Sequence, residues 1–146
     1  MKLQTKFDEI LEINESDILH FDNGLPGFEE EKQFILLPIE DTELFMLQSI
    51  NQKNLAFITT NPFVFFHNYD FELGSQEQKL LGVKEENDVY VQVIITVSDP
   101  YVKSTANLQA PIIINTKNNK CKQVVLTDSR YRTKHFLTEA IIGQEG

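Results

Sequence analysis

Val89-Tyr90-Val91-Gln92-Val93-Ile94-Ile95-Thr96-Val97 is the stretch of sequence that decides the fold. Its residues are almost all β-branched or aromatic, and these residue types favour strands. The run is also long, since most strands have about five or six residues. We therefore expect the strongest strand of the protein here.

Outward from this strand, two pairs of apolar runs each flank a polar segment that suits a hairpin loop. The runs are Leu44–Gln48 with Leu55–Thr59, and Ile112–Ile114 with Gln123–Leu126. Further short runs, such as Phe34–Leu37, stand between turn signals. About eight strands at this spacing are typical of a barrel or a sandwich.

Helical periodicity is scarce, and one segment predicts a helix of about two turns, Ser75–Leu81. Ser75 can cap its start, Gln78 holds the capping-box position and Gly82 can close its end. The sequence therefore predicts a mostly β fold, a small antiparallel β barrel-like single domain with one or two short helices. This domain is expected to span residues 1–137, followed by a mobile tail at 138–146.

The composition is that of an ordinary globular domain of 146 residues. Hydrophobic residues make up 41% and charged residues 24%, which is too apolar for a disordered chain. No apolar run approaches the roughly 20 residues that cross a bilayer, and the first residues hold no apolar segment of a secretory signal. The sequence predicts no membrane partner and a cytoplasmic location, with which a single cysteine agrees.

That cysteine, Cys121, stands between Lys120 and Lys122. Neighbouring cations can lower the pKa of a thiol and make it reactive. In a strand, however, alternation places Cys121 on one face and both lysines on the other. We favour the second interpretation, in which Cys121 packs as an ordinary side chain.

Acidic residues outnumber basic ones, 22 to 13, which gives a net charge of −9 and argues against direct binding to nucleic acid. Residues 1–99 hold 19 of the acids and 6 of the bases. Three acidic clusters adjoin turn signals and are expected to be exposed, because burying unpaired carboxylates is costly. They are Glu29–Glu31, Glu40–Glu43 and Glu85–Asp88. They form either a solvated surface or a face that attracts a basic partner.

Few residues have the spacing of a catalytic or metal site. His67 and Asp70 are close enough in sequence to form a general base. We interpret them instead as turn residues that close an aromatic segment. The histidines also lack the helical spacing of metal ligands. The sequence therefore predicts no enzymatic activity, no metal and no cofactor.

Five aromatic residues fall within Phe63–Phe71. Alternation along a strand would bury only about half of such a cluster on one sheet face. The remaining side chains either pack beneath a loop or form an exposed partner site.

The segment Gly24-Leu25-Pro26-Gly27 is typical of a tight turn. Proline presets φ, and glycine supplies the positive φ that such turns need. At least one of the two glycines is therefore expected to have a positive φ.

Polar and apolar residues alternate over Thr105–Pro111, which is typical of a half-buried strand. Pro111 cannot donate a ladder hydrogen bond, so we expect this segment at a sheet edge. Asn107 is expected to be mainly structural and to hydrogen-bond a neighbouring turn. A role in partner binding is the alternative.

Three segments in this order resemble a known family. Ile18–Phe28 carries a hydrophobic-x-Phe-x-x-Gly-hydrophobic-Pro-Gly-Phe pattern, and the other two are Asn61–Phe71 and Thr105–Asn115. Over residues 1 to about 136 of an acidic chain of this length, they are similar to the FliW family of flagellar assembly factors. The sequence departs from the family at His67-Asn68, where Pro-Asp usually precedes the tyrosine.

The resemblance implies a non-enzymatic, cytoplasmic regulator with a small, mostly β barrel-like fold. Proteins of this family bind flagellin and, alternatively, CsrA, a small RNA-binding translational repressor that silences the flagellin message. When unsecreted flagellin occupies FliW, CsrA is released and flagellin translation stops. A small-molecule-binding β barrel remains the alternative function, and it requires a cavity lined by aromatic residues.

Candidate partner-binding residues come from the second and third segments and from the last acidic cluster. They are Phe65, Phe66, Tyr69, Asp70, Phe71, Glu85, Glu86, Asp88 and Asn107. Gly24, Pro26 and Gly27 are expected to serve the turn alone.

Overall fold

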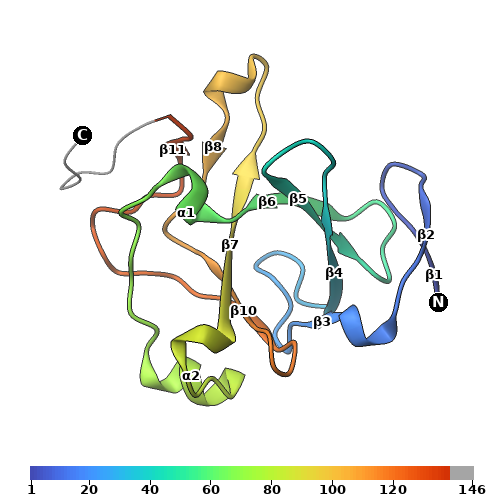
Figure 1. The fold of residues 1–146 in the computed structure, drawn as a ribbon, viewed down its shortest axis with the longest axis horizontal. Helices are drawn as coiled ribbons and strands as arrows, with labels where there is room; N and C mark the ends of the chain where they lie inside the picture. The colour runs from blue at the N-terminus through green and yellow to red at the C-terminus, as the bar shows by residue number, and fades with distance from the viewer. Residues whose placement is uncertain (139–146) are drawn as a thin grey trace.

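The computed structural model describes residues 1–138 and is built mainly of antiparallel strands (Figure 1). Strands contain 34% of the residues and helices 14%, so the predicted mostly β fold with one or two short helices is confirmed. The predicted tail begins at residue 138, and residues 139–146 lie outside the described residues.

The elements follow one another along the chain as follows. The strands are β1 (Lys2–Gln4), β2 (Ile10–Glu12), β3 (Leu19–His20), β4 (Gln33–Pro38), β5 (Leu44–Ser49), β6 (Ala56–Thr60), β7 (Val89–Thr96), β8 (Thr105–Ala106), β9 (Ile112–Asn115), β10 (Cys121–Gln123) and β11 (His135–Phe136). The helices are α1 (Pro62–Phe65) and α2 (Ser75–Leu81), with short 3-10 segments η1 (Glu15–Asp17), η2 (Glu86–Asp88) and η3 (Tyr101–Lys103).

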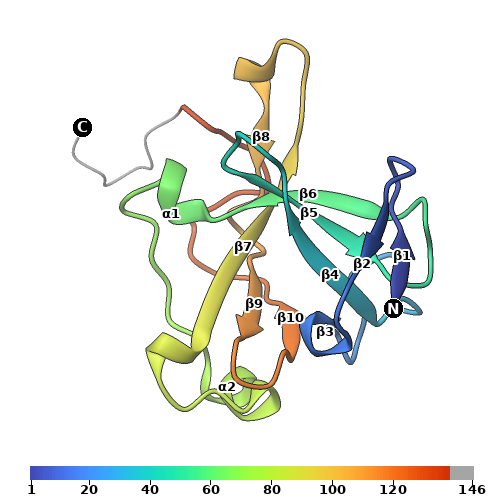
Figure 2. The ribbon, with the colours of Figure 1, turned by 45° about the vertical axis from the view of Figure 1, so that its right-hand side comes forward.

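The main sheet has the order β10-β9-β7-β6-β5-β4-β3, and it closes on itself. His20 of β3 forms a parallel bridge with Lys120 next to β10, through a 2.9 Å hydrogen bond from the His20 N–H to the Asn119 carbonyl. This contact joins the two ends of the sheet, which gives the barrel-like shape that the sequence predicted. β1 and β2 form a separate hairpin at the side of the barrel (Figure 2).

β7 confirms the strand predicted from the opening stretch, and it pairs with three strands. Residues Val89–Gln92 pair with β9, Val93 and Ile94 with β6, and Ile95 and Thr96 with β8. Such a strand is buried on both faces, because the side chains of β7 contribute to separate packed clusters on each side. This explains why its sequence is apolar throughout.

Both predicted hairpins form, β5 with β6 and β9 with β10. β10 ends at Gln123, earlier than the predicted run to Leu126. Beyond Gln123 the chain bonds to an irregular segment instead, with Val124 N–H donating to the Pro111 carbonyl at 2.9 Å. Because Pro111 has no N–H to return, the regular ladder stops there.

Helix α2 has the predicted bounds, but Gly74 rather than Ser75 stands at its N-cap. Gln78 does not complete a capping box; its side-chain amide donates to the Leu73 carbonyl at 2.6 Å. At the other end Gly82 adopts φ 71°, as its position predicted.

The aromatic segment does not form the alternating strand from which its burial was argued. Asn61 caps helix α1 by accepting a hydrogen bond from the Phe63 N–H at 2.9 Å, and Pro62 occupies the first turn. Both residues favour a helix start, and this signal outweighed the aromatic content. After Phe66 the chain continues without regular structure to Gly74.

Aromatic side chains fill the interior. Phe21 packs edge-on against Phe34 with ring centres 5.3 Å apart, and Tyr69 packs edge-on against Tyr131 at 4.7 Å. All four are at most 2% exposed. This filled interior argues against a barrel that encloses a small molecule.

Cys121 is buried as alternation predicted, and its lysine neighbours do not activate it. Burial raises the pKa of its thiol to about 12. At neutral pH the thiol therefore stays protonated and unreactive.

Thr105 and Ala106 do not lie at a sheet edge, and that expectation was wrong. β8 pairs with β7 on one side and with β11 on the other. The partner strand β11 comes from the far C-terminal part of the described chain, which local alternation does not reveal. Pro111 is accommodated because it falls in the irregular stretch before β9.

The turn at Gly24-Leu25-Pro26-Gly27 has the predicted backbone, with φ 63° at Gly24 and 83° at Gly27. The two glycines differ in their surroundings. A Cβ on Gly24 would lie 2.6 Å from the Phe28 carbonyl oxygen, whereas a Cβ on Gly27 would meet nothing within 4 Å.

This difference makes the two glycines a matched pair for mutation. Gly27→Ala is expected to lower the free energy of unfolding by about 1 kcal/mol, because only the positive φ opposes alanine. Gly24→Ala adds a backbone clash and is expected to cost about 2–4 kcal/mol. Urea denaturation of both variants measures the difference, and equal losses would contradict the role of the close backbone approach.

Candidate functional site

A groove of about 680 Å³ runs along the first half of β7. One wall is the irregular segment 69–73, and the other is the loop 83–86 that follows α2. Its floor includes Val89 and Val91 of β7. The remaining lining residues are Phe63, Tyr69, Asp70, Phe71, Glu72, Leu73, Gln78, Val83, Lys84, Glu85 and Glu86.

Helix α2 brings the two walls together. Its Glu77 forms an ion pair with Lys122 of β10, and the Leu81 carbonyl accepts a 2.8 Å hydrogen bond from the Asn115 side chain. These contacts fix both ends of the helix against the β9–β10 hairpin. The segments that enter and leave α2, 69–73 and 83–86, both line the same groove.

Five of the candidate partner-binding residues line this one groove. They are Tyr69, Asp70, Phe71, Glu85 and Glu86. Asp70, Glu85 and Glu86 are exposed at the rim, Phe71 is half-buried and Tyr69 is buried below them. Two regions that were selected from the sequence for separate reasons, the aromatic segment and the third acidic cluster, thus form one surface.

The other candidates lie elsewhere. Phe66 is 1% exposed and packs edge-on against His135, so it belongs to the core. Phe65 is half-buried against the same core cluster. The aromatic cluster is thus divided between core packing and one wall of the groove.

Asp88 is buried, and the expectation that the whole third acidic cluster is exposed was wrong at this residue. Its carboxylate accepts hydrogen bonds from the Lys84 and Glu85 N–H groups at 3.2 and 3.1 Å. The bond from Glu85 is one half of a capping box at η2, in which the Glu85 side chain in turn accepts from the Asp88 N–H. These hydrogen bonds offset the cost of burying the charge. Asp88 therefore shapes the loop that carries Glu85 and Glu86.

The remaining acids of the three clusters are exposed except Glu31, which is half-buried. Its carboxylate accepts a hydrogen bond from the Ser49 hydroxyl at 3.3 Å.

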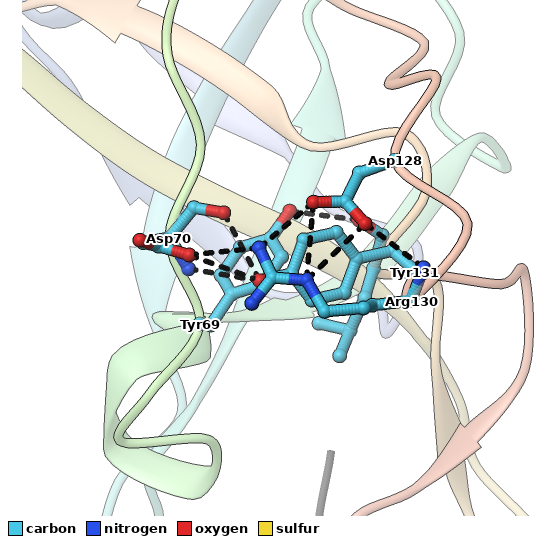
Figure 3. Close-up of polar contacts among 6 residues, drawn as sticks. Tyr69, Asp70, Asp128, Arg130 and Tyr131 are labelled. Atoms are coloured by element: carbon cyan, nitrogen blue, oxygen red, sulfur yellow. Dashed lines mark hydrogen bonds and ion pairs between the residues drawn. The ribbon is translucent and has the colours of Figure 1, made fainter. Parts of the chain in front are cut away.

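Tyr131 holds the wall of the groove formed by segment 69–73, and no pattern in the sequence indicated this role. Its hydroxyl accepts a hydrogen bond from the Asp70 N–H at 3.1 Å and donates toward Asp70, whose carbonyl lies at 3.0 Å (Figure 3). A single side chain thus satisfies both backbone groups of a residue in an irregular segment. Sequence patterns could not reveal this contact because the two residues are 61 positions apart.

Arg130 adds charge to this contact. Its guanidinium bonds Asp128 at 2.8 Å and Asp70 at 3.1 Å, and it lies 5.0 Å from the Tyr131 ring centre (Figure 3). Hydrogen bonds from Arg130 lower the pKa of the Asp128 carboxyl. Burial raises the pKa of both Tyr69 and Tyr131. At neutral pH the phenols are therefore neutral, and the Asp128 carboxylate is charged.

His67 lies in a turn as predicted, whereas Asp70 lies beyond that turn in the irregular segment. The Asp70 carboxylate contacts Arg130 and Tyr131. His67 does not line the groove. Within residues 1–138 no three His, Cys, Asp or Glu side chains gather as metal ligands would.

Asn107 has the structural role that its position predicted. Its side-chain oxygen accepts hydrogen bonds from the Gln109 and Ala110 N–H groups, both at 3.1 Å. These bonds hold the irregular stretch between β8 and β9. Asn107 does not line the groove.

The fold and groove define a small β barrel-like domain with an acidic, partly apolar surface groove. None of the helices of the described chain is both long and apolar enough to cross a membrane. The family model described as "FliW protein" matches residues 2–137, and the chain belongs to the FliW family. The resemblance of the three sequence segments is thereby confirmed.

Relatives of known name agree with this membership. The flagellar assembly factor FliW of Geobacillus kaustophilus is 49% identical over 137 residues, covering 94% of this chain and 95% of its own. That of Bacillus subtilis is 50% identical over 136 residues, covering 92% and 95%. A crystal structure of the flagellar assembly factor FliW superposes with a TM-score of 0.90 at 45% identity, covering 95% and 98%.

The Tyr131 contact can be tested by removing one oxygen. Tyr131→Phe leaves the Asp70 backbone groups without their partner and is expected to lower the free energy of unfolding by about 1 kcal/mol. Tyr101→Phe is the control, because Tyr101 is exposed, and it should change stability by less than about 0.5 kcal/mol. Urea titrations compare the two variants, and equal stabilities would contradict the role of the hydroxyl.

Asn107 offers a second test of structure against binding. Asn107→Ala removes the acceptor of two backbone N–H groups and is expected to cost about 1–3 kcal/mol, while Asn107→Asp keeps an acceptor oxygen and should cost less. Thermal unfolding measures both. An unchanged melting temperature with lost partner binding would show that the structural assignment is wrong.

Proposed function

We propose that this protein is a non-enzymatic, cytoplasmic flagellar assembly factor that binds flagellin and, alternatively, the translational repressor CsrA. Binding of CsrA antagonises its repression, so that partner exchange couples flagellin translation to flagellin secretion. The observation that carries this proposal is similarity over nearly the whole chain to relatives named flagellar assembly factors.

The charge distribution supports a basic partner. A protein that holds RNA needs positive charge to contact phosphates, which makes CsrA a natural match for an acidic surface. The exposed acids of residues 1–99 provide that surface, and Glu85 and Glu86 place part of it at the groove. An acidic protein seated on CsrA would also repel RNA.

The groove supports the second partner, flagellin, through its apolar residues. Phe63 is 40% exposed at one end, and Phe71, Leu73 and Val83 are half-buried along it. Partly exposed apolar side chains in a groove are typical of peptide recognition. We propose the groove as the partner-binding site, with Tyr69, Asp70, Phe71, Glu85 and Glu86 as its principal residues.

A pull-down tests the proposal directly. The tagged protein is used to capture partners from a lysate of a flagellated bacterium, and flagellin and CsrA are detected by mass spectrometry. Both are expected, and added purified flagellin should displace CsrA. Capture of neither protein would contradict the proposal.

The two partners are expected to differ in their response to salt. Single exposed ion pairs contribute only about 0–1 kcal/mol, so the acids should act through their summed field on the association rate. The Debye length falls from about 10 Å at 0.1 M to about 3 Å at 1 M salt, so CsrA association should slow steeply. Flagellin binding, led by apolar contacts, should change much less.

Stopped-flow or biosensor kinetics across a salt series provide the measurement. Equal salt slopes for the two partners would mean that the acidic clusters do not select CsrA. The clusters would then serve as a solvated surface only.

A further inference from the structure

β7 has two edges that can hydrogen-bond to neighbouring strands, and the second of them has no strand partner over half of its length. On the first side, β9 and then β8 pair with it almost from end to end. On the second side, β6 pairs only with Val93 and Ile94. Within residues 1–138, no strand lies along the second side between Val89 and Gln92.

The reason for the gap lies in β6. Thr60 pairs with Val93, so continuing the antiparallel register would place Pro62 opposite Val91. Proline has no N–H to donate to a neighbouring strand, and Asn61 instead starts helix α1. The chain therefore leaves β7 at this point, and the open edge follows from the sequence.

The backbone direction shows which groups face the open side. The carbonyls of Asp88 and Ile94 accept hydrogen bonds from Thr116 and Asn107, on the β9 and β8 side. Backbone groups alternate along a strand, so those of Val89 and Val91 point the other way.

Two of these four groups already have partners. The Val89 N–H donates to the Glu86 carbonyl, and the Val91 carbonyl accepts a long 3.3 Å hydrogen bond from its neighbour's side chain, Gln92. The strand pairing of residues 1–138 assigns no partner to the Val89 carbonyl or the Val91 N–H. A backbone pair of this kind can bond an added strand.

The groove lies on this open side. In Figure 2 the irregular segment between α1 and α2 lies on the side of β7 away from β9. Val89 and Val91 line the groove together with Phe71 and Leu73 of that segment. The groove therefore contains both an open strand edge and apolar side chains.

The rim decides the charge of an occupant. Asp70, Glu72, Glu85 and Glu86 line the groove and are exposed, against one lysine, Lys84. Asp70 is already paired with Arg130, so the other three acids set the charge of the rim. A second copy of this chain, with a net charge of −9, would bring like charge to the edge. Apolar side chains on the groove floor and carboxylates on its rim fit a segment in which apolar and basic residues alternate.

We propose that the groove binds an extended segment of a partner protein by strand addition to the open edge of β7 at Val89–Val91. Alternate side chains of that segment contact the apolar floor, and lysines or arginines face the rim acids. This inference deepens the proposed function, on which it rests for the identity of the natural partner.

Amide exchange of the whole, isotope-labelled chain tests the site with a defined probe, a short synthetic peptide of alternating valine and lysine. We expect exchange of the Val91 N–H to slow at least tenfold at saturating peptide. The Tyr90 and Gln92 N–H groups, already paired with β9, serve as internal controls and should not change. A matched peptide of valine and glutamate should have no effect.

Unchanged exchange at Val91 would overturn the proposal, whether or not the peptide binds elsewhere, and so would equal effects of the two peptides. Because this readout needs neither flagellin nor CsrA, it fails separately from the proposed function, which the pull-down tests.

Charge reversal at the rim gives an independent test. The double variant E72K/E86K, which leaves the Glu85 cap of η2 in place, is expected to weaken binding of the valine–lysine peptide at least tenfold, as measured by calorimetry. The control is E29K/E30K, which reverses two exposed acids that do not line the groove. Equal losses in both double variants would mean that only net charge attracts the peptide and would overturn the assignment to this groove.

Discussion

The pairing of β7 with strands on both of its sides is the constraint on which the rest of the structure depends. The strand joins β9 and β8 on one side and β6 on the other, so it connects the two halves of the barrel. Val93, where β6 meets β7, is fully buried. Residues there must suit strand geometry and apolar surroundings together, which β-branched residues do best.

The groove is a consequence of how that pairing ends. β6 cannot follow β7 past Thr60 because Asn61 and Pro62 begin a helix instead. The chain then passes through an irregular segment and α2 before it reaches the start of β7. Packing of α2 on the β9–β10 hairpin, through Glu77 and Lys122, determines where this return occurs. The groove residues on either side of α2 are thus positioned by contacts that α2 makes with the β9–β10 hairpin.

Irregular segments can carry a binding surface when side chains hold their backbone in place. Here Tyr131 satisfies both backbone groups of Asp70, and Asp88 caps the loop that carries Glu85 and Glu86. Neither residue needs to touch a partner to affect binding. The buried Asp88 carboxylate and the buried Tyr131 phenol instead limit the conformations of the two walls. Less conformational entropy is therefore lost when the proposed partner binds.

The sequence by itself determined the elements whose signals are local. The composition of β7, the two hairpins, the Gly82 helix end and the positive φ of Gly24 and Gly27 each depend on residues within a few positions. Motif order over the whole chain likewise identified the family. Only the tertiary structure decided which distant segments are in contact. These contacts bury Phe66 and Asp88, pair β11 with β8 and join Tyr131 to Asp70. Periodicity and capping signals describe neighbours along the chain, whereas these contacts depend on which segments meet after the barrel has closed.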